Sequence, residues 1–241
     1  MKDKLINYLI SGLPISVGTL GSIRQPTIKE LISNDINIDT FIQPFIISKE
    51  VLEADKENPF YEQIKNFDLM FLEQLVVDGK PILALLVDSL KFIYDIDEKE
   101  ISIVGQIITI KSKNVFITRD NFDTLSEIIL SMFNREKPKP KPKPKYKNDY
   151  QKKIMEKLNK KREEQAKKKM LHLCDYINAV AHFSNTPNYA FILDLTYYQL
   201  INSFNILRVK ENYEDYLKYL TSSKFEIKDK TNHWITDIKN N

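Results

Sequence analysis

The sequence predicts a mostly helical α+β protein with a mixed N-terminal part and a helical C-terminal part. Apolar residues recur at helical spacing in several segments, and one segment rich in Ile, Val and Thr changes to a period of two. Four Lys-Pro repeats at 137–144 separate the two parts. We therefore expect a mixed domain at 1–134 with a small antiparallel sheet, a Lys-Pro spacer at 135–149, and a long basic helix, a helical segment and a tail at 150–241.

Several local signals place elements in the first hundred residues. A helix is expected to begin near Pro26 and Thr27, because proline and threonine are favoured at helix starts. Asp78–Gly79 indicates a turn. Further helices are expected at 36–52, 61–77 and 81–96. The first has Asp39 or Thr40 as its cap, and Pro44 lies early in it or breaks it. The last is apolar enough to be buried.

The segment 100–122 predicts two or three antiparallel strands. Its isoleucines alternate with more polar residues on both sides of Gly105–Gln106, and a second turn is expected at 111–114. Asp120 or Asn121 then caps a helix whose apolar residues lie on one face: Phe122, Leu125, Ile128, Ile129 and Met132.

The charge is concentrated in the middle of the chain. The net charge of the 241 residues is +3, but 135–169 contains 16 Lys/Arg and 5 Asp/Glu, which is +11 and leaves −8 for the remainder. Alternating proline excludes helix and sheet at 137–144, so we expect an extended spacer. An electrostatic contact is a second role for this region, carried by Lys139, Lys141, Lys143, Lys145, Lys147, Lys152 and Lys153. The third interpretation is that the region only connects two folded parts and has no role of its own.

One long helix is expected from Tyr150 to about Ser184, polar in its first half and apolar in its second. Thr196 and Gln199 then form a capping box before a helix over 197–207, and a further helix follows at 213–220. Aromatic and aliphatic residues lie at helical spacing on these two helices and are the expected partner-binding surface: Tyr197, Tyr198, Leu200, Ile201, Phe204, Tyr213, Tyr216, Leu217 and Leu220.

The motifs of common catalytic and phosphate-binding sites are absent from the sequence. It contains no GxxxxGK[ST], GxGxxG or GxSxG. His172, Cys174 and His182 cannot face one metal ion from a single helix, because their spacing directs them apart. We expect Cys174 to be a small core residue, and His182 to be buried or to lie at a helix C-terminus. No catalytic residue, cofactor or metal is predicted.

Two further expectations concern the surroundings of the protein. A single cysteine excludes an internal disulfide and indicates a reducing compartment. No membrane-spanning helix is expected, because no apolar stretch approaches about 18 residues. The apolar N-terminus is interrupted by Asp3, Asn7 and Pro14, so we expect mature sequence rather than a signal peptide.

Four segments together resemble a known group of proteins. They are SGLPISVGTLGSIRQPTIKELI, ISIVGQIITIKSKNVFITRDNFDTLSEIIL, LTYYQLINSFNILRVKENYEDYLKYL and the tail that carries His233 and Trp234. Their order resembles the tail assembly chaperones of phages and prophages of low-GC Gram-positive bacteria, or a neighbouring tail or baseplate component. The resemblance implies no catalysis. It implies binding of the tape measure, tube or baseplate proteins in the host bacterial cytoplasm, or a place in the virion, and it transfers no individual functional residue.

Three functions follow from these observations. The first is a non-enzymatic assembly chaperone or structural adaptor of tail morphogenesis. The alternative is a nucleic-acid-binding accessory protein that uses the basic region 137–169, whose lysines attract phosphate without sequence preference. An enzyme of unrecognised type is the third, and the scarcity of glycine, with five in the chain, argues against it.

Overall fold

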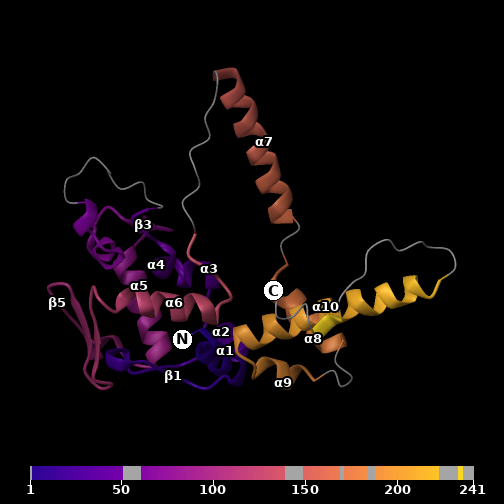
Figure 1. Ribbon diagram of the computed structural model, residues 1–241. Coiled ribbons are helices and arrows are strands. Elements are labelled where there is room, and N and C mark those ends of the chain that lie inside the picture. Colours follow the sequence, from indigo (N-terminus) through magenta and orange to yellow (C-terminus); the bar gives the residue numbers. More distant parts are fainter. Residues whose placement is uncertain are drawn as a thin grey trace.

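The computed structural model describes residues 2–50, 61–138, 149–168, 171–183, 188–222 and 233–235 (Figure 1). The α-helices are α1 (Lys2–Ser11), α2 (Ile28–Ser33), α3 (Ile38–Phe41), α4 (Gln43–Ile46), α5 (Ile82–Tyr94), α6 (Phe122–Met132), α7 (Asp149–Lys168), α8 (Leu173–Phe183), α9 (Tyr189–Leu193) and α10 (Tyr197–Leu220). The strands are β1 (Ile15–Ser16), β2 (Ser22–Ile23), β3 (Val76–Val77), β4 (Lys80–Pro81), β5 (Ile101–Val104), β6 (Ile107–Ile110) and β7 (Val115–Ile117). The short 3₁₀ helices are η1 (Gly18–Leu20), η2 (Tyr61–Gln63), η3 (Asn66–Phe71) and η4 (Glu98–Glu100). The predicted mostly helical α+β class is confirmed.

The helix starts near the N-terminus follow from capping. The Thr27 hydroxyl accepts from the Glu30 N–H at 3.2 Å, and the Glu30 carboxylate accepts from the Thr27 N–H at 2.8 Å, so α2 begins with a full capping box. The predicted caps of the next helix, Asp39 and Thr40, are wrong. The cap is Asn37, because its side chain reaches the free Thr40 N–H at 3.1 Å.

The single helix predicted at 61–77 is wrong. The segment forms η2, η3 and strand β3 instead. Its apolar residues exceed one helical stripe: Phe67, Leu69 and Met70 are all buried, and the Phe67 ring lies 5.0 Å from that of Phe122 on α6. Packing of η3 against α5 and α6 therefore overrides the helical pattern.

Helix α5 and the three-stranded sheet are as predicted. Strand order is β5-β6-β7, both pairs antiparallel, and α5 is buried along most of its length. One face of the sheet belongs to the core: Ile108, Ile110, Val115 and Ile117 are buried there. Helix α6 begins after Asn121, as predicted, although the Asn121 side chain accepts from the Thr118 N–H rather than from the helix.

The predicted single helix from Tyr150 to Ser184 is wrong, and so is the division of the last helical region into two. Helix α7 ends at Lys168, and α8 restarts at Leu173 where the Asp175 carboxylate accepts from the His172 N–H at 2.8 Å. Helix α10 is instead continuous over 24 residues. Helix α9 and the β1–β2 hairpin were not predicted, because each is too short to show a clear period. Helix α1 was not predicted, because the apolar residues of this segment were weighed only against a signal peptide.

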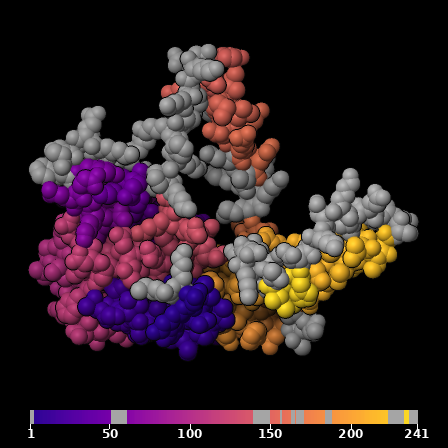
Figure 2. Space-filling view, viewed as in Figure 1, coloured from indigo at the N-terminus to yellow at the C-terminus, as the bar shows by residue number. Residues whose placement is uncertain are grey.

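The hydrophobic core includes residues from both ends of the chain. Val180, Ala181, Ile192 and Leu200, from α8, α9 and α10, belong to the same buried cluster as the residues of α5 and α6. Figure 2 shows the orange C-terminal helices directly against the indigo N-terminal segment. Helix α7 instead projects away from the body (Figure 1). The limits 1–134, 135–149 and 150–241 stay a prediction.

Candidate partner-binding groove

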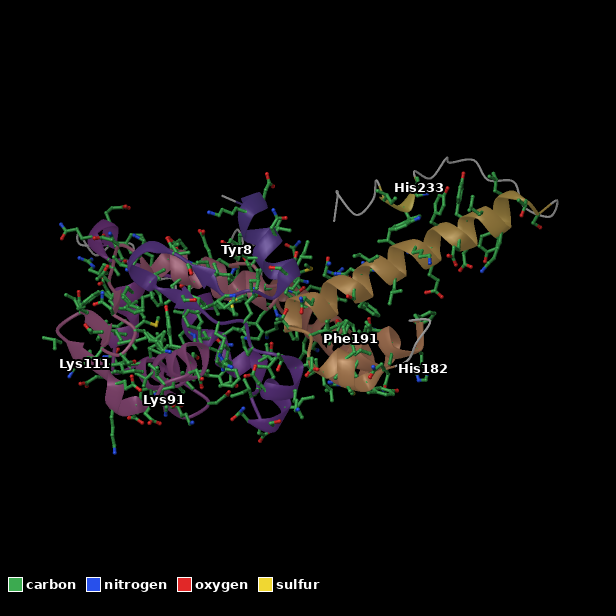
Figure 3. All side chains as sticks on the ribbon, turned by 90° about the horizontal axis from the view of Figure 1, so that it is seen from below. Tyr8, Lys91, Lys111, His182, Phe191 and His233 are labelled. Carbon is green, nitrogen blue, oxygen red and sulfur yellow. The ribbon has the colours of Figure 1, made fainter. Side chains whose placement is uncertain are left out.

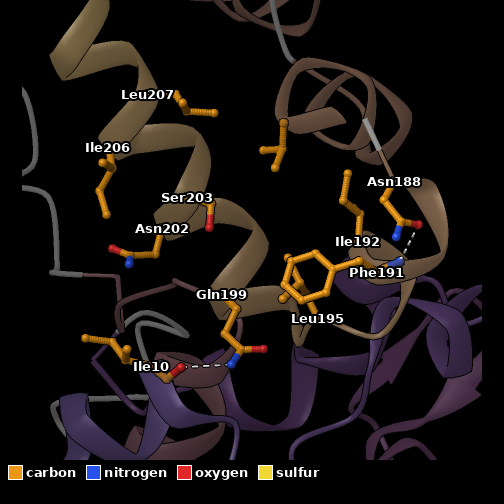
Figure 4. Close-up of a pocket in the computed structure, with 11 residues that line it drawn as sticks. Ile10, Asn188, Phe191, Ile192, Leu195, Gln199, Asn202, Ser203, Ile206 and Leu207 are labelled. Carbon is orange, nitrogen blue, oxygen red and sulfur yellow. Dashed lines mark hydrogen bonds between the residues drawn. The ribbon is translucent and has the colours of Figure 1, made fainter. Parts of the chain in front are cut away.

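A groove lies where the end of α1 meets α8, α9 and α10 (Figure 4). Its volume is about 860 Å³. It is lined by Ile10, Val180, Asn188, Phe191, Ile192, Leu195, Gln199, Asn202, Ser203, Ile206 and Leu207.

The lining is apolar and uncharged. Seven of these residues are aliphatic or aromatic, and the polar ones carry only amide or hydroxyl groups. Phe191 is 64% exposed and Ile10 is 51% exposed, which is unusual for large apolar side chains beside a cavity. The groove can therefore bury apolar surface of a partner, whereas its lining offers no carboxylate, imidazole or thiol for proton transfer.

Gln199 fixes α10 against α1. Its Oε1 accepts from the Thr196 N–H at 2.8 Å, which completes the predicted capping box. Its Nε2 donates to the Ile10 carbonyl at 2.8 Å, and Figure 4 shows this bond at the floor of the groove. One side chain thus caps the helix and joins two walls of the groove.

The backbone makes a second connection beside the first. The Ile28 N–H donates to the Leu195 carbonyl at 2.8 Å, and Thr27 and Thr196 form an antiparallel bridge. Both threonines are helix caps, so the start of α2 and the start of α10 are fixed to each other.

Gly12 makes room for Gln199. Its φ is +69°, and a Cβ at this position would lie 3.1 Å from Gln199 Nε2. The turn after α1 therefore needs glycine for its backbone conformation and for the approach of the amide.

Helix α9 forms the opposite wall. The Asn188 side chain caps it by accepting from the Phe191 N–H at 3.2 Å. Ile192 is 2% exposed and anchors the helix in the core, which leaves Phe191 on the groove side.

The predicted partner-binding residues divide into two groups. Leu200 and Ile201 are buried, and the rings of Tyr197 and Phe204 pack on Phe133 at 5.5 Å and on Tyr176 at 4.9 Å. Burial raises the pKa of the Tyr197 hydroxyl, and it raises that of Tyr198 as well. This group contributes to intramolecular packing and is not an open surface.

The second group lies on the outer half of α10. Leu217 and Leu220 are exposed, while Tyr213 is half-buried, with its ring 6.3 Å from Tyr216 and 5.0 Å from His233. Figure 3 shows His233 alongside this half of the helix, away from the body. The structure therefore does not bring the nine residues together as one surface, and the groove lies beside them.

The groove was missed as a site at the sequence level, although five of its residues lie on the helix predicted at 197–207: Gln199, Asn202, Ser203, Ile206 and Leu207. Ile10, Phe191 and Ile206 come from segments that no local pattern relates. The one local signal that could have marked this face is the helical spacing of the polar residues Gln199, Asn202 and Ser203 in the first half of α10.

The basic residues lie partly outside the described residues. Lys139, Lys141, Lys143, Lys145 and Lys147 belong to the segment 139–148, which is not described. Lys152 and Lys153 are exposed on α7.

The core position predicted for Cys174 is wrong, because this residue is exposed. The inward stripe of α8 is formed by Leu173, Tyr176, Ile177, Val180 and Ala181, and Cys174 falls off it. His182 is exposed in the last turn of α8 (Figure 3). In the described parts of the chain, no group of three His, Cys, Asp or Glu residues could hold a metal ion. None of the described helices has the length and hydrophobicity needed to cross a membrane.

Comparison with known proteins concerns the C-terminal part of the chain. No curated protein and no solved structure matches the chain. A family model described as the YomV second domain matches residues 160–239, which run from within α7 through α10 to the tail. The match includes every groove residue except Ile10. Over these 80 residues the chain is similar to the YomV second domain, and this similarity supports a protein of phage or prophage type.

Proposed function

We propose that this protein is a non-enzymatic assembly chaperone or adaptor in phage tail morphogenesis, and that it binds an amphipathic helix of another tail protein in the groove. The observation that carries the proposal is the uncharged apolar groove with Phe191 and Ile10 exposed beside it. The tape measure, tube and baseplate proteins are the candidate partners, and the host bacterial cytoplasm, or the virion itself, is the place of binding.

The spacing of the lining residues supports a helical partner. Gln199, Asn202, Ser203 and Ile206 follow i, i+3, i+4, i+7 along α10, so the groove runs beside that helix. A helix laid in such a groove buries its own apolar stripe against Phe191, Ile192 and Leu195. The amide of Asn202 supplies orienting hydrogen bonds, and the apolar contacts supply most of the affinity.

Co-purification with the neighbouring tail proteins tests this proposal. The full chain and Phe191→Ser are expressed with each tail protein in turn, and the recovered complex is quantified. Truncating an aromatic anchor of this kind costs more than about 1 kcal/mol of binding free energy, so the complex should weaken at least about fivefold. Phe183→Ser is the matched control, because Phe183 is 58% exposed but does not line the groove.

Two results would contradict the proposal. One is the recovery of no tail protein with the unaltered chain. The other is equal weakening by Phe191→Ser and Phe183→Ser, since that would indicate nonspecific apolar adhesion.

Nucleic-acid binding is the second candidate function, favoured by the exposed basic residues of α7. Lys152, Lys153, Lys157, Lys160, Lys161 and Arg162 are exposed on a helix that projects from the body. A filter-binding titration at two salt concentrations should then show a steep loss of affinity with salt. Lys152→Ala/Lys153→Ala should reduce both the affinity and the salt slope, while Lys29→Ala/Lys113→Ala, also exposed, should not. Affinity that is unchanged by salt would exclude this function.

A further inference from the structure

The β5 edge of the three-stranded sheet has no neighbouring strand. Among the described residues, β5 (Ile101–Val104) pairs only with β6. Figure 1 shows β5 at the outer margin of the molecule. An open edge presents backbone donors and acceptors to any strand that can approach it.

The register identifies which backbone groups point outward. The Lys111 N–H donates to the Glu100 carbonyl at 3.2 Å, so that pair is hydrogen-bonded across β5 and β6. Hydrogen-bonded pairs alternate in an antiparallel ladder, so Ser102 and Val104 bond inward while Ile101 and Ile103 point outward. The Ile101 N–H is used within η4, where it donates to the Glu98 carbonyl. Within the described chain, Ile103 is thus the residue of β5 whose outward N–H and carbonyl are both free.

The edge lacks the usual protection. Residues 101–104 include neither a charge nor a proline. Ile103 is 40% exposed and Val104 is 73% exposed. Such an edge is open to pairing with another strand, although its four residues keep the contact small.

We propose that β5 pairs antiparallel with β5 of a second copy of this chain, about a two-fold axis at Ile103. Ile103 is then opposite Ile103 of the other copy, and its N–H and carbonyl bond to the same groups across the axis. Ser102 is opposite Val104 of the other copy, and Ile101 is opposite Gly105. Two-fold dimers are the commonest symmetric oligomers of soluble proteins.

Charge and side-chain directions favour the second copy as the occupant. In this register Glu100 is opposite Gln106 and Lys99 is opposite Ile107, so no like charges meet. Ile103 shares a face with its partner on β6, the buried Ile108, so the Ile103 pair extends the core face of the sheet across the axis. The pairing involves β5 only and is independent of the groove and of the proposed function.

The oligomeric state of the full chain tests the proposal. Sedimentation over a concentration series should show a reversible monomer–dimer equilibrium. Ile103→Pro removes the outward N–H without touching the inward ladder, and Ile103→Lys places a charge at the edge. Both should be monomeric at concentrations where the unaltered chain is dimeric. Phe116→Ser is the matched control, because Phe116 is also 40% exposed but lies on β7, and it should remain dimeric.

Cross-linking tests the register. In a Cys174→Ser background, Ser102→Cys and Val104→Cys are oxidised separately and as a mixture. Opposite residues in a non-hydrogen-bonded pair have Cα atoms about 4.5 Å apart, close enough for a disulfide. The mixture should therefore cross-link more than either variant alone.

Three outcomes would overturn the proposal. They are a monomer at every concentration, a dimer that persists in both Ile103 variants, and equal cross-linking in the mixture and in the separate samples. Circular dichroism confirms that each variant is folded, and Phe191→Ser should leave the dimer unchanged whether or not the groove binds a tail protein.

Discussion

Gln199 donates a hydrogen bond from Nε2 to the carbonyl of Ile10, 2.8 Å away and 189 positions earlier in the sequence. The same side chain accepts from the Thr196 N–H, so it serves a local helix cap and a long-range contact together. The contact and the packing of α10 lead to three predictions, and the capping box of α2 leads to a fourth.

Gln199→Ala should lower the free energy of unfolding by about 1–2 kcal/mol. The substitution removes the capping box and leaves the Ile10 carbonyl without this donor. Urea unfolding followed by circular dichroism measures the change. Gln106→Ala, at an exposed hairpin turn, is the control and should change stability by less than about 0.5 kcal/mol. Equal effects would mean that the contact contributes nothing.

Gly12→Ala should destabilise the protein more than Gly79→Ala. Both glycines have positive φ, +69° and +79°, so both substitutions cost roughly 1–2 kcal/mol in backbone strain. Only the alanine at 12 meets Gln199 Nε2, at 3.1 Å, whereas a Cβ at 79 meets open space. The difference between the two unfolding free energies therefore measures the close approach, and a difference of zero would show that Gln199 moves freely.

Leu200→Ala should cost about 2–5 kcal/mol of stability and Leu220→Ala less than about 0.5 kcal/mol. Both residues lie on α10, but Leu200 is 0% exposed in the common core and Leu220 is 55% exposed. Thermal unfolding monitored by calorimetry should show one transition shifted downward for Leu200→Ala. A wild-type melting temperature in that variant would show that α10 does not belong to the cooperative unit.

The stability of the α2 start should depend on pH through Glu30. Partial burial raises the pKa of this carboxyl, but the Thr27 backbone N–H and the Arg24 guanidinium outweigh it and hold the pKa below its ordinary range. A lowered folded-state pKa gives stability that is present above the unfolded pKa, about 4.3, and is lost as the pH falls below it.

Glu30→Gln should therefore lose less stability than the unaltered chain when the pH is lowered from 6 to 3. Glutamine can still form the capping box, so the comparison isolates the charge. Glu73→Gln, at an exposed position, serves as the control and should follow the unaltered chain. Parallel pH curves for Glu30→Gln and the unaltered chain would refute the assignment.

Elements whose local pattern agrees with their burial were predictable. Helix α5, the β5–β6–β7 sheet, helix α6 and the Thr196 capping box follow from periodicity, turn residues and caps that all point to the same structure. The structure of the segment 61–77 did not follow from its periodicity, because its phenylalanines pack against α5 and α6 rather than form one helical stripe.

The groove could not be predicted for a different reason. Its walls come from α1, α8, α9 and α10, and no single-sequence pattern relates Ile10 to Phe191. The resemblance to tail proteins was spread over most of the chain and marked no site, whereas the family match covers only residues 160–239. Leu200 and Ile201 are buried in the fold. In the sequence alone, apolar residues at helical spacing look the same whether they pack inside the protein or form a binding surface, so these two were assigned to the partner-binding surface.

The packing of Tyr197 on Phe133 can form only late in the synthesis of the chain. Phe133 is 1% exposed in the finished chain, and the Tyr197 ring lies 5.5 Å from it. Tyr197 is synthesised 64 residues after Phe133, which takes roughly 3–13 s at about 5–20 residues per second. During that interval the Tyr197 ring cannot cover Phe133, so the growing chain passes through a stage at which this part of the core is less shielded from water than in the finished protein.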